Sequence, residues 1–260
     1  MIRTVAETGS TNADMLMLAG AGASEGLWLR AERQTGGRGR QGRAWSSPEG
    51  NLYASTLARL RPGDPQAATL ALVTAVALEE VVRAYLPSFP REGGGPESRS
   101  ASSVALDPRL RGGIAGVLQI KWPNDLLLDG AKLSGILLER AGDAVVIGIG
   151  VNLAHHPTHL DRAVTSLAAH GGVPDPADFI ETLADAFARW LGIWRGEGLA
   201  PVRARWLDRA HPVGTALTAR LPDGSAIDGL FQGLDDAGAL ILRLADGATR
   251  VIHAADVFLI

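Results

Sequence analysis

Residues 117–139 read Val-Leu-Gln-Ile-Lys-Trp-Pro-Asn-Asp-Leu-Leu-Leu-Asp-Gly-Ala-Lys-Leu-Ser-Gly-Ile-Leu-Leu-Glu. Short apolar runs recur through this stretch and just beyond it, separated by polar or turn-forming residues, and each run has the length of a strand. They predict four strands, at 117–121, 126–128, 135–139 and 144–151. Asp129-Gly130 is a two-residue hairpin signal, so we expect the strands on either side of it to pair as antiparallel neighbours.

The regions around this stretch mix helices with strands. Thr-Gly-Ser-Thr-Asn at 8–12 precedes an apolar segment and is typical of a helix N-terminus, because hydroxyl and amide side chains cap free backbone N–H groups. Other segments show apolar side chains at helical spacing or in short strand-like runs. The predicted helices cover 65–86, 176–195 and 199–209, and the further predicted strands cover 27–31 and 52–60.

The C-terminal part has a different character. From Val213 to Ile260 short apolar runs alternate with turn signals such as Pro222-Asp223-Gly224. Turns about ten residues apart predict a small all-β barrel or sandwich. We therefore expect two domains, 1–210 and 211–260. Residues 87–113 are rich in Gly, Pro and Ser with little apolar pattern, which predicts a flexible insertion in the first domain.

The composition of the 260 residues fits a soluble globular protein, with 46% hydrophobic residues, 20% charged residues and a formal net charge of −3. The absence of cysteine excludes disulfides, thiolate metal sites and a cysteine nucleophile. No apolar run resembles a secretory signal or approaches the ~20 residues that a membrane-spanning helix needs. We therefore expect a cytoplasmic protein that does not contact a membrane.

The segment 36–43 is a candidate anion-binding loop. It reads Gly-Gly-Arg-Gly-Arg-Gln-Gly-Arg and is followed closely by Trp45. Glycine lets main-chain N–H groups approach an oxyanion, and arginine forks match carboxylate and phosphate oxygens. The residues alone leave open an RNA-binding Gly-Arg segment or an ordinary solvated loop. The acidic net charge speaks against nucleic acid, since nucleic-acid binders usually carry a basic excess.

A second cluster of polar residues follows in Lys121-Trp-Pro-Asn-Asp125, with Lys132 close by. Both lysines lie in apolar surroundings at the ends of predicted strands, and a buried lysine needs a partner, either Asp125 or an external anion. Asn124 can donate and accept, as a purine edge or a phosphate requires, and Asp125 could hold Mg²⁺ through water. The alternative is an ordinary turn in which Asp125 pairs with a lysine.

Taken together, these motifs resemble the biotin protein ligase family. The matching segments, in this order, are 9–12, 36–45, 121–125, 132–139 and Ile-Gly-Ile-Gly-Val-Asn at 147–152. The resemblance runs from Glu7 to the C-terminus. It implies a fold of the α/β (α+β) class, a mixed sheet flanked by helices with a small SH3-like β-barrel after it. The chain departs from the family by the insertion and by starting at the catalytic domain, without the DNA-binding winged helix of bifunctional members.

The resemblance also implies a reaction in two steps. Biotin's carboxylate attacks the α-phosphate of ATP, giving biotinyl-5′-AMP and pyrophosphate. A lysine of an acceptor then attacks the mixed anhydride and AMP is released. The implied substrates are biotin and ATP with Mg²⁺, and the implied partner is a biotin carboxyl carrier domain of the acetyl-CoA carboxylase type. Neither nucleic acid nor membrane is expected, and a homodimer through a sheet edge is consistent with the family.

Site residues are carried over from the family pattern by position. Lys132 and Arg40 are the expected catalytic residues, Lys132 because a fixed cation offsets the repulsion between carboxylate and phosphate. The expected biotin-binding residues are Ser10, Thr11, Asn12, Gln34, Arg38, Gly39, Arg40 and Lys132. The expected ATP and Mg²⁺ residues are Lys121, Asn124, Asp125, Asn152 and Trp45, with Asp125 as the candidate for contact with the metal.

Two other readings stay open. A lipoate or octanoate ligase of the same superfamily would handle a linear acyl chain, for which hydrogen-bonding residues at 10–12 and Gln34 would have no purpose. His155, His156 and His159 lie close together, and histidine clusters can bind zinc. They have no adjacent cysteine or acidic partner, and Pro157 indicates a loop, so we do not predict a metal site there.

Overall fold

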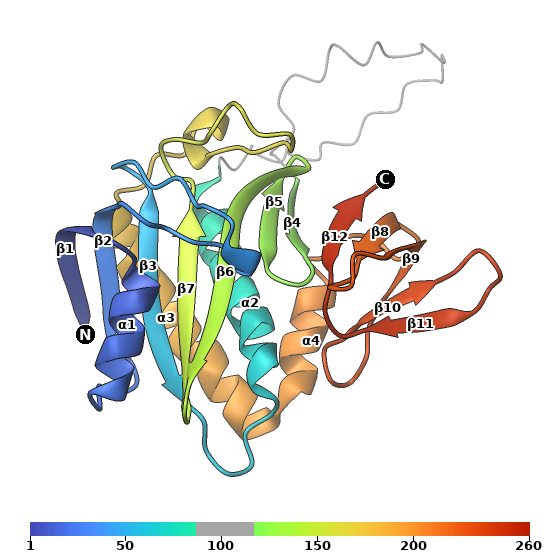
Figure 1. Ribbon diagram of the computed structural model, residues 1–260, viewed down its shortest axis with the longest axis horizontal. Helices are drawn as coiled ribbons and strands as arrows, with labels where there is room; N and C mark the ends of the chain where they lie inside the picture. Colours follow the sequence, from blue (N-terminus) through green and yellow to red (C-terminus); the bar gives the residue numbers. More distant parts are fainter. Residues whose placement is uncertain (87–116) are drawn as a thin grey trace, which may run out of the picture.

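The computed structural model describes residues 1–86 and 117–260, so the predicted insertion at 87–113 lies outside the described residues. A seven-stranded mixed sheet with strand order β1-β2-β3-β7-β6-β5-β4 forms the larger part of the fold (Figure 1). Its strands are β1 (Ile2–Thr8), β2 (Trp28–Gln34), β3 (Leu52–Arg59), β4 (Leu118–Lys121), β5 (Asp125–Leu128), β6 (Ala131–Ala141) and β7 (Ala144–Val151). Only the β1–β2 pair is parallel, and the other neighbours in this sheet are antiparallel.

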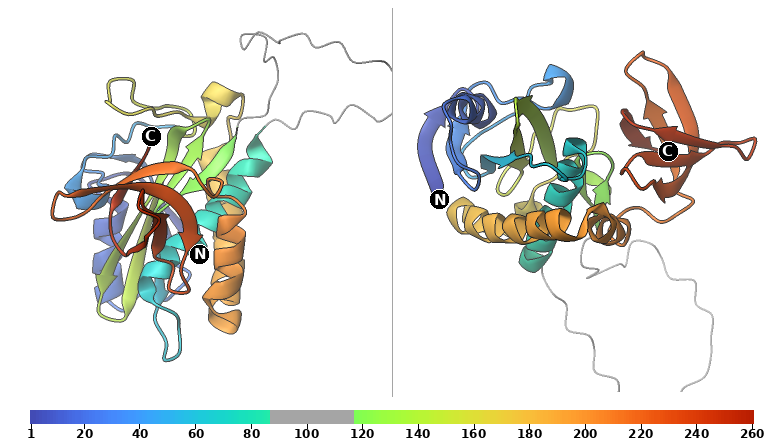
Figure 2. Two further views of the ribbon diagram at one scale, coloured as in Figure 1. Left: turned by 90° about the vertical axis from the view of Figure 1, so that its right-hand side faces the viewer. Right: turned by 90° about the horizontal axis from the view of Figure 1, so that it is seen from below.

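Helices cover both faces of the sheet. The short helix α1 (Thr11–Gly20) contacts β3 and β7 on one face, while α2 (Leu70–Tyr85) and α3 (Pro176–Glu197) pack together on the other (Figure 2). Helix α4 (Leu199–Leu207) follows directly and contacts α2 and α3. The α1 face is therefore covered over a smaller area than the α2 face.

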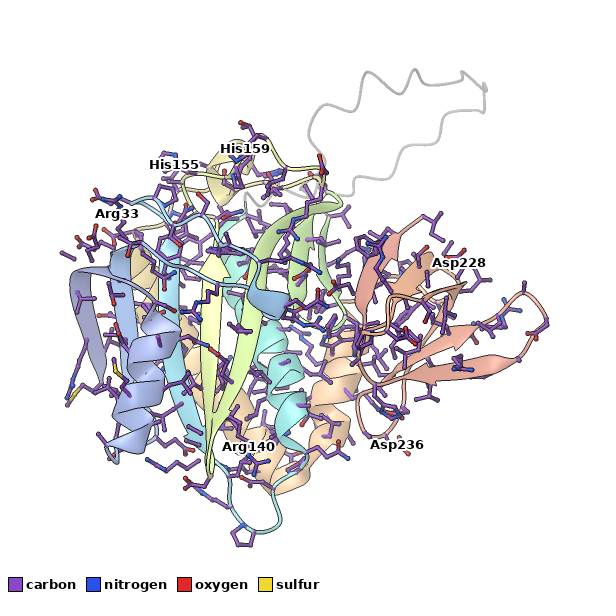
Figure 3. All side chains as sticks on the ribbon, in the orientation of Figure 1. Arg33, Arg140, His155, His159, Asp228 and Asp236 are labelled. Atoms are coloured by element: carbon purple, nitrogen blue, oxygen red, sulfur yellow. The ribbon has the colours of Figure 1, made fainter. Side chains whose placement is uncertain are left out.

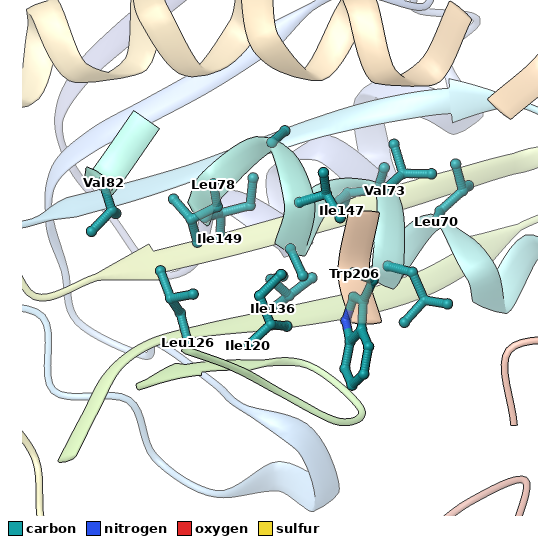
Figure 4. Close-up of a cluster of buried hydrophobic side chains, with 14 of the residues drawn as sticks. Leu70, Val73, Leu78, Val82, Ile120, Leu126, Ile136, Ile147, Ile149 and Trp206 are labelled. Carbon is teal, nitrogen blue, oxygen red and sulfur yellow. The ribbon is translucent and has the colours of Figure 1, made fainter. Parts of the chain in front are cut away.

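Side-chain alternation along the central strands separates two kinds of surface. Ile147 and Ile149 of β7, with Ile136 of β6, point into the core and meet Leu70, Val73 and Leu78 of α2 (Figure 4). On the other face of β7, Ala144 and Val146 lie under α1, and the next two residues on that face are Gly148 and Gly150. Because successive side chains of a strand alternate between faces, this glycine pair leaves a hollow beside α1 rather than more core.

The C-terminal strands form a five-stranded antiparallel sheet with order β11-β10-β9-β8-β12. They are β8 (Ala216–Arg220), β9 (Ala226–Leu234), β10 (Leu240–Arg243), β11 (Thr249–Ile252) and β12 (Asp256–Leu259). This sheet lies against the first part of the chain, where Lys121 Nζ donates to Val257 O at 2.8 Å and Trp122 Nε1 donates to Gly238 O at 3.1 Å. The division of the chain into two domains at residue 210 stays a prediction.

The predicted elements agree with the structure in kind, and their ends shift. All four strands predicted between 117 and 151 are present, and the predicted helix at 65–86 begins at Leu70 after a 3₁₀ turn, Ala67–Thr69. Strand β1 was not predicted, because an edge strand with exposure on both faces shows no apolar alternation. No described helix is long and apolar enough to span a membrane.

Candidate active site

A cavity of about 270 Å³ opens on the α1 face of the sheet, under the Gly-Arg loop and beside β12. All the predicted biotin-binding residues line it: Ser10, Thr11, Asn12, Gln34, Arg38, Gly39, Arg40 and Lys132. Four of the five predicted ATP residues line it as well, namely Lys121, Asn124, Asp125 and Trp45. Segments from residue 10 to residue 259 therefore meet at one site.

The α1 end of the cavity is a continuous hydrogen-bond network. Thr11 N donates to Gln34 Oε1 at 2.9 Å, and Thr11 Oγ1 lies 2.8 Å from Ser55 Oγ. Ser55 Oγ donates to Asn12 Oδ1 at 2.8 Å, and Asn12 Nδ2 donates to Glu139 Oε2 at 2.6 Å. Thr11, Asn12 and Ser55 are buried, so these hydrogen bonds hold their side chains in fixed orientations.

The glycines of β7 provide the room for this arrangement. A Cβ atom at Gly148 would overlap the Asn12 carboxamide, and a Cβ atom at Gly150 would lie 2.6 Å from Cε2 of Trp45. Real Cβ atoms essentially never approach so closely. The Gly-x-Gly spacing of β7 is therefore required on this face because one glycine lies against Asn12 and the other against Trp45.

The β5 end of the cavity is charged. Asp125 forms ion pairs with Lys132 and with Lys121, whose Nζ lies 3.2 Å from Asp125 Oδ2. Burial alone would raise the pKa of the Asp125 carboxyl, but the two ammonium groups outweigh it and hold that pKa below its ordinary range. Burial lowers the pKa of Lys132, and Asp125 offsets only part of that effect. Lys132 is thus a desolvated cation that gains from an added anion.

The Gly-Arg loop is attached to the C-terminal sheet. Arg40 donates to Asn124 Oδ1 at 3.3 Å and to Ala255 O at 3.2 Å, and it lies 3.6 Å from Asp256 Oδ1. Arg43 forms an ion pair with the other oxygen of Asp256. The loop is therefore ordered over the cavity by two carboxylate contacts from β12.

Trp45 forms one wall between the two ends. Its ring lies against Gly150 and Gly135, which are register partners in β7 and β6. Lys132 Nζ lies 5.7 Å from the ring centroid, within range of a cation–π contact. The indole Nε1 is buried and has no hydrogen-bond partner in the described part of the chain. Trp45 is thus in contact with the proposed catalytic cation and retains an unused donor.

Asn152 is the one predicted site residue that does not line this cavity. Its Nδ2 donates to Thr165 O at 3.0 Å, which fixes the loop after β7. It lines an adjoining cavity of about 430 Å³, shared with Trp45, Lys132 and His159. A role in ATP binding therefore requires the nucleotide to extend from the first cavity into the second.

The role predicted for Asp125, contact with Mg²⁺ through water or the nucleotide, stays a prediction. Both oxygens of Asp125 already accept from lysine ammonium groups, so the geometry does not favour Asp125 as a direct Mg²⁺ ligand. Across residues 1–86 and 117–260, no three His, Cys, Asp or Glu side chains gather as a metal site would need. The labelled His155 and His159 lie on the loop after β7, above the sheet (Figure 3). Magnesium would enter as the counterion of ATP, as part of a substrate.

The structure adds three residues that sequence reasoning missed, namely Ser55, Glu139 and Asp256. Glu139 ends a motif that was singled out, but nothing in the sequence pairs it with Asn12. Ser55 is one hydroxyl within a predicted strand, and Asp256 lies more than 200 residues from the arginines it contacts. No local signal in the sequence could have identified Ser55 or Asp256 as site residues.

Comparison with known proteins gives consistent results along the chain. Residues 18–152 match the family described as biotin/lipoate A/B protein ligase, and residues 214–260 match the biotin protein ligase C-terminal domain. The sequence is 40% identical over 265 residues to a biotin--[acetyl-CoA-carboxylase] ligase of Paracoccus denitrificans, covering 98% of each chain. It is 33% identical over 257 residues to the Mycobacterium tuberculosis enzyme of the same name, covering 97% of this chain and 86% of that one.

Solved structures of similar fold include a biotin protein ligase from Aquifex aeolicus in complex with biotin and ATP. Its TM-score is 0.80 at 22% identity, over 100% of this chain and 99% of that one. A biotin protein ligase from Leishmania major in complex with biotinyl-5-AMP has a TM-score of 0.61 at 25% identity, over 97% of this chain and 98% of that one.

Proposed function

The chain belongs to the biotin/lipoate A/B protein ligase family, and we propose that its cavity activates biotin with ATP and passes the biotinyl group to a lysine of a biotin carrier domain. The enzyme is an ATP-dependent biotin--[acetyl-CoA-carboxylase] ligase, with biotin and ATP as substrates. The assignments of single residues below are proposals.

One observation carries the proposal: a single cavity has a hydrogen-bonding network at one end and clustered cations at the other. Biotin has the matching shape, a ureido head that donates and accepts hydrogen bonds and a carboxylate at the end of an apolar chain. Thr11, Asn12 and Gln34 would meet the head, and Lys132 and Arg40 would meet the carboxylate. The apolar wall between them includes Leu137.

In the first step a carboxylate oxygen of biotin forms a bond to the α-phosphorus of ATP, and the bond from that phosphorus to pyrophosphate breaks. The two reacting groups are both anionic, and their repulsion raises the barrier. Lys132 has a side chain that is 14% exposed, is fixed by Asp125 and lies close to Trp45, so it would supply a positive charge that needs little reorganisation. A preorganised donor of this kind is typically worth ~10²–10³ in rate.

In the second step the amine of the carrier lysine forms a bond to the acyl carbon, and AMP leaves with the electron pair of the anhydride bond. The intermediate must be kept from water until the carrier arrives. Arg40 supports this role, because it ties the loop to Asn124 and to the C-terminal sheet over the cavity. Ordering of a loop over a reactive intermediate is a common way to exclude water.

Lipoate is the alternative acyl substrate within the family. Its dithiolane ring and linear chain carry no ureido group. The hydrogen-bond network at the α1 end would then be buried without a partner on the ligand, which costs binding energy. A site built to hydrogen-bond a polar head rejects ligands that lack it, so biotin is the substrate that these residues favour.

The acceptor protein and the oligomeric state are also proposals. The acceptor is a carrier domain of the acetyl-CoA carboxylase type, by analogy with the named relatives. A homodimer through a sheet edge would use β1, whose outer side has no strand partner in the described sheet. Binding to nucleic acid is not expected at a net charge of −3.

The deciding experiment is mass spectrometry of a purified carrier domain after incubation with the chain, ATP, Mg²⁺ and biotin. We expect a mass increase of one biotinyl group on one lysine, and none when ATP is omitted. Equal modification by lipoate in place of biotin would overturn the substrate assignment. No modification by either acid would overturn the ligase function.

A further inference from the structure

Glu139 has no role in the reaction described above, yet it contacts the biotin-head network directly. It lies on β6, is half-buried, and pairs with no cation among the described residues. A carboxylate in such a place is costly unless hydrogen bonds compensate for lost water. The 2.6 Å hydrogen bond from Asn12 Nδ2 supplies that compensation, and it also constrains Asn12.

The constraint follows from counting hydrogens. An ionised carboxylate only accepts hydrogen bonds, so the amide nitrogen of Asn12, and not its oxygen, must face Glu139. The oxygen Oδ1 must then face Ser55, whose hydroxyl has to donate to it at 2.8 Å. Ser55 has a single hydrogen, so its contact with Thr11 Oγ1 at 2.8 Å requires Thr11 to be the donor.

The same count extends to the loop. The single hydroxyl hydrogen of Thr11 is committed to Ser55, so Thr11 Oγ1 does not donate to Gln34 Oε1, which lies 3.2 Å away, and that oxygen accepts from Thr11 N at 2.9 Å instead. Gln34 Nε2 then faces Ser47 Oγ at 3.1 Å, and Ser47 Oγ donates to Trp45 O at 3.0 Å. Thr11, Ser55 and Asn12 thus donate in one direction, toward Glu139, and the amide orientation of Gln34 is fixed with them.

We propose that Glu139 is a positioning residue that sets this direction and thereby presents Asn12 to the ligand as a hydrogen-bond donor. The inference rests on the proposed function, because it concerns the ureido head of biotin. With one N–H of Asn12 bound to Glu139, the other N–H is available to a ligand carbonyl in the cavity that Asn12 lines. A ureido carbonyl accepts such a bond, and a dithiolane ring does not.

This single direction of hydrogen bonding would be lost if the side chain at position 139, which accepts from Asn12, could also donate. A glutamine at 139 can turn its amide nitrogen toward Asn12 and donate a hydrogen bond to Asn12 Oδ1. The Asn12 amide can then rotate, Ser55 can donate to Thr11, and both directions become allowed. Biotin would have to select one of them, which weakens binding without removing any ligand contact.

The test measures biotin affinity by calorimetry for the wild type, Glu139→Gln, Asn12→Ala and the double variant. We expect Glu139→Gln to weaken biotin binding about tenfold, because the apparent Kd rises as the inverse of the fraction of protein in the wild-type direction, and the neutral amide leaves that direction in the minority. The KM for ATP should change by less than about twofold. In the Asn12→Ala background the same substitution should change biotin affinity by less than about twofold, since Glu139 acts through Asn12.

Glu32→Gln is the matched control, because Glu32 is an exposed residue of the same sheet whose side chain makes no hydrogen bond or ion pair in the described structure, and the substitution removes the same charge. It should leave biotin affinity unchanged. Unchanged affinity in Glu139→Gln would overturn the inference, and so would an equal loss in both backgrounds or a parallel rise in the KM for ATP. A wild-type protein that binds no biotin would instead contradict the proposed function itself.

Discussion

At the α1 end of the cavity the polar groups are mostly neutral and each hydrogen bond is already made, whereas the β5 end gathers lysines, arginines and two carboxylates. The neutral end is built from residues of α1, β2, β3 and β6, and it is ready before a ligand arrives. At the charged end Asp125 and Asp256 pair with the cations that an anionic substrate would need. The difference shows that recognition of the head can be preorganised, while the charged end must exchange internal ion pairs for ligand anions.

The largest effect should come from removing the mostly buried lysine of the charged end. Lys132→Ala should slow pyrophosphate release by ~10²–10³, because the repulsion between carboxylate and phosphate is no longer offset. Biotin affinity without ATP should fall much less, since the head network is untouched. The measurement is pyrophosphate release at saturating biotin and ATP beside calorimetry with biotin alone. A rate of pyrophosphate release within tenfold of the wild type would show that the chemical step does not depend on Lys132 at the charged end.

The two glycines of β7 allow the α1 end and the charged end of the cavity to be tested separately, because Gly148 lies against Asn12 and Gly150 lies against Trp45. Gly148→Ala should displace Asn12, and Gly150→Ala should displace Trp45. Overpacking typically costs ~1–3 kcal/mol, or about tenfold to hundredfold in affinity. We expect Gly148→Ala to weaken biotin binding and Gly150→Ala to raise the KM for ATP. Each variant is the control for the other, and the same defect in both would mean that the ends are not independent.

Arg40 should affect retention more than chemistry. Arg40→Gly removes the contacts with Asn124, Ala255 and Asp256 and adds backbone freedom, so the loop should hold biotinyl-5′-AMP poorly. We expect pyrophosphate release to continue while biotin appears on a bystander protein such as albumin. Arg33→Gly, which removes an exposed arginine of β2, should label no bystander. Loss of pyrophosphate release without bystander labelling would place Arg40 in the chemical step.

The smallest effect concerns pH and lies outside the cavity. His211 is buried near Lys121, and burial followed by that charge lowers its pKa to about 4. Unfolded histidine titrates near 6.5, so between pH 6.5 and 4 the unfolded state binds more protons and stability falls as pH falls. The slope should reach at most about 1.4 kcal/mol per pH unit.

Urea unfolding at several pH values would measure this slope. His211→Gln should flatten it, and His253→Gln, at an exposed histidine, should not. The charged end should contribute little over this range, because the pKa of Asp125 is held below its ordinary value and its ion pairs persist. An unchanged slope in His211→Gln would assign the acid sensitivity to a group other than His211.

Much of the seven-stranded sheet and its helices could be predicted from local patterns. The strands from 117 to 151 were identified because fully buried strands give continuous apolar runs. Helix α3 was found because its apolar side chains, including Phe179 and Trp194, recur on one face. Strand β1 was missed because tertiary pairing with β2, and no pattern of its own, makes it a strand.

By itself the sequence determined the chemistry of the site. Its glycine, arginine and lysine motifs indicate an anionic ligand, because glycine frees main-chain N–H groups to approach an oxyanion and the cations supply positive charge. It also determined many of the residues that line the cavity, since the family motifs supply them by position, but it did not supply Ser55 or Asp256. Only the tertiary structure decided that Asp256 contacts the Gly-Arg loop and that Glu139 contacts Asn12. These are contacts between residues more than 100 positions apart, and local sequence carries no signal for them. They exist because the sheet places β6 beside the start of α1 and the C-terminal sheet places β12 beside the loop.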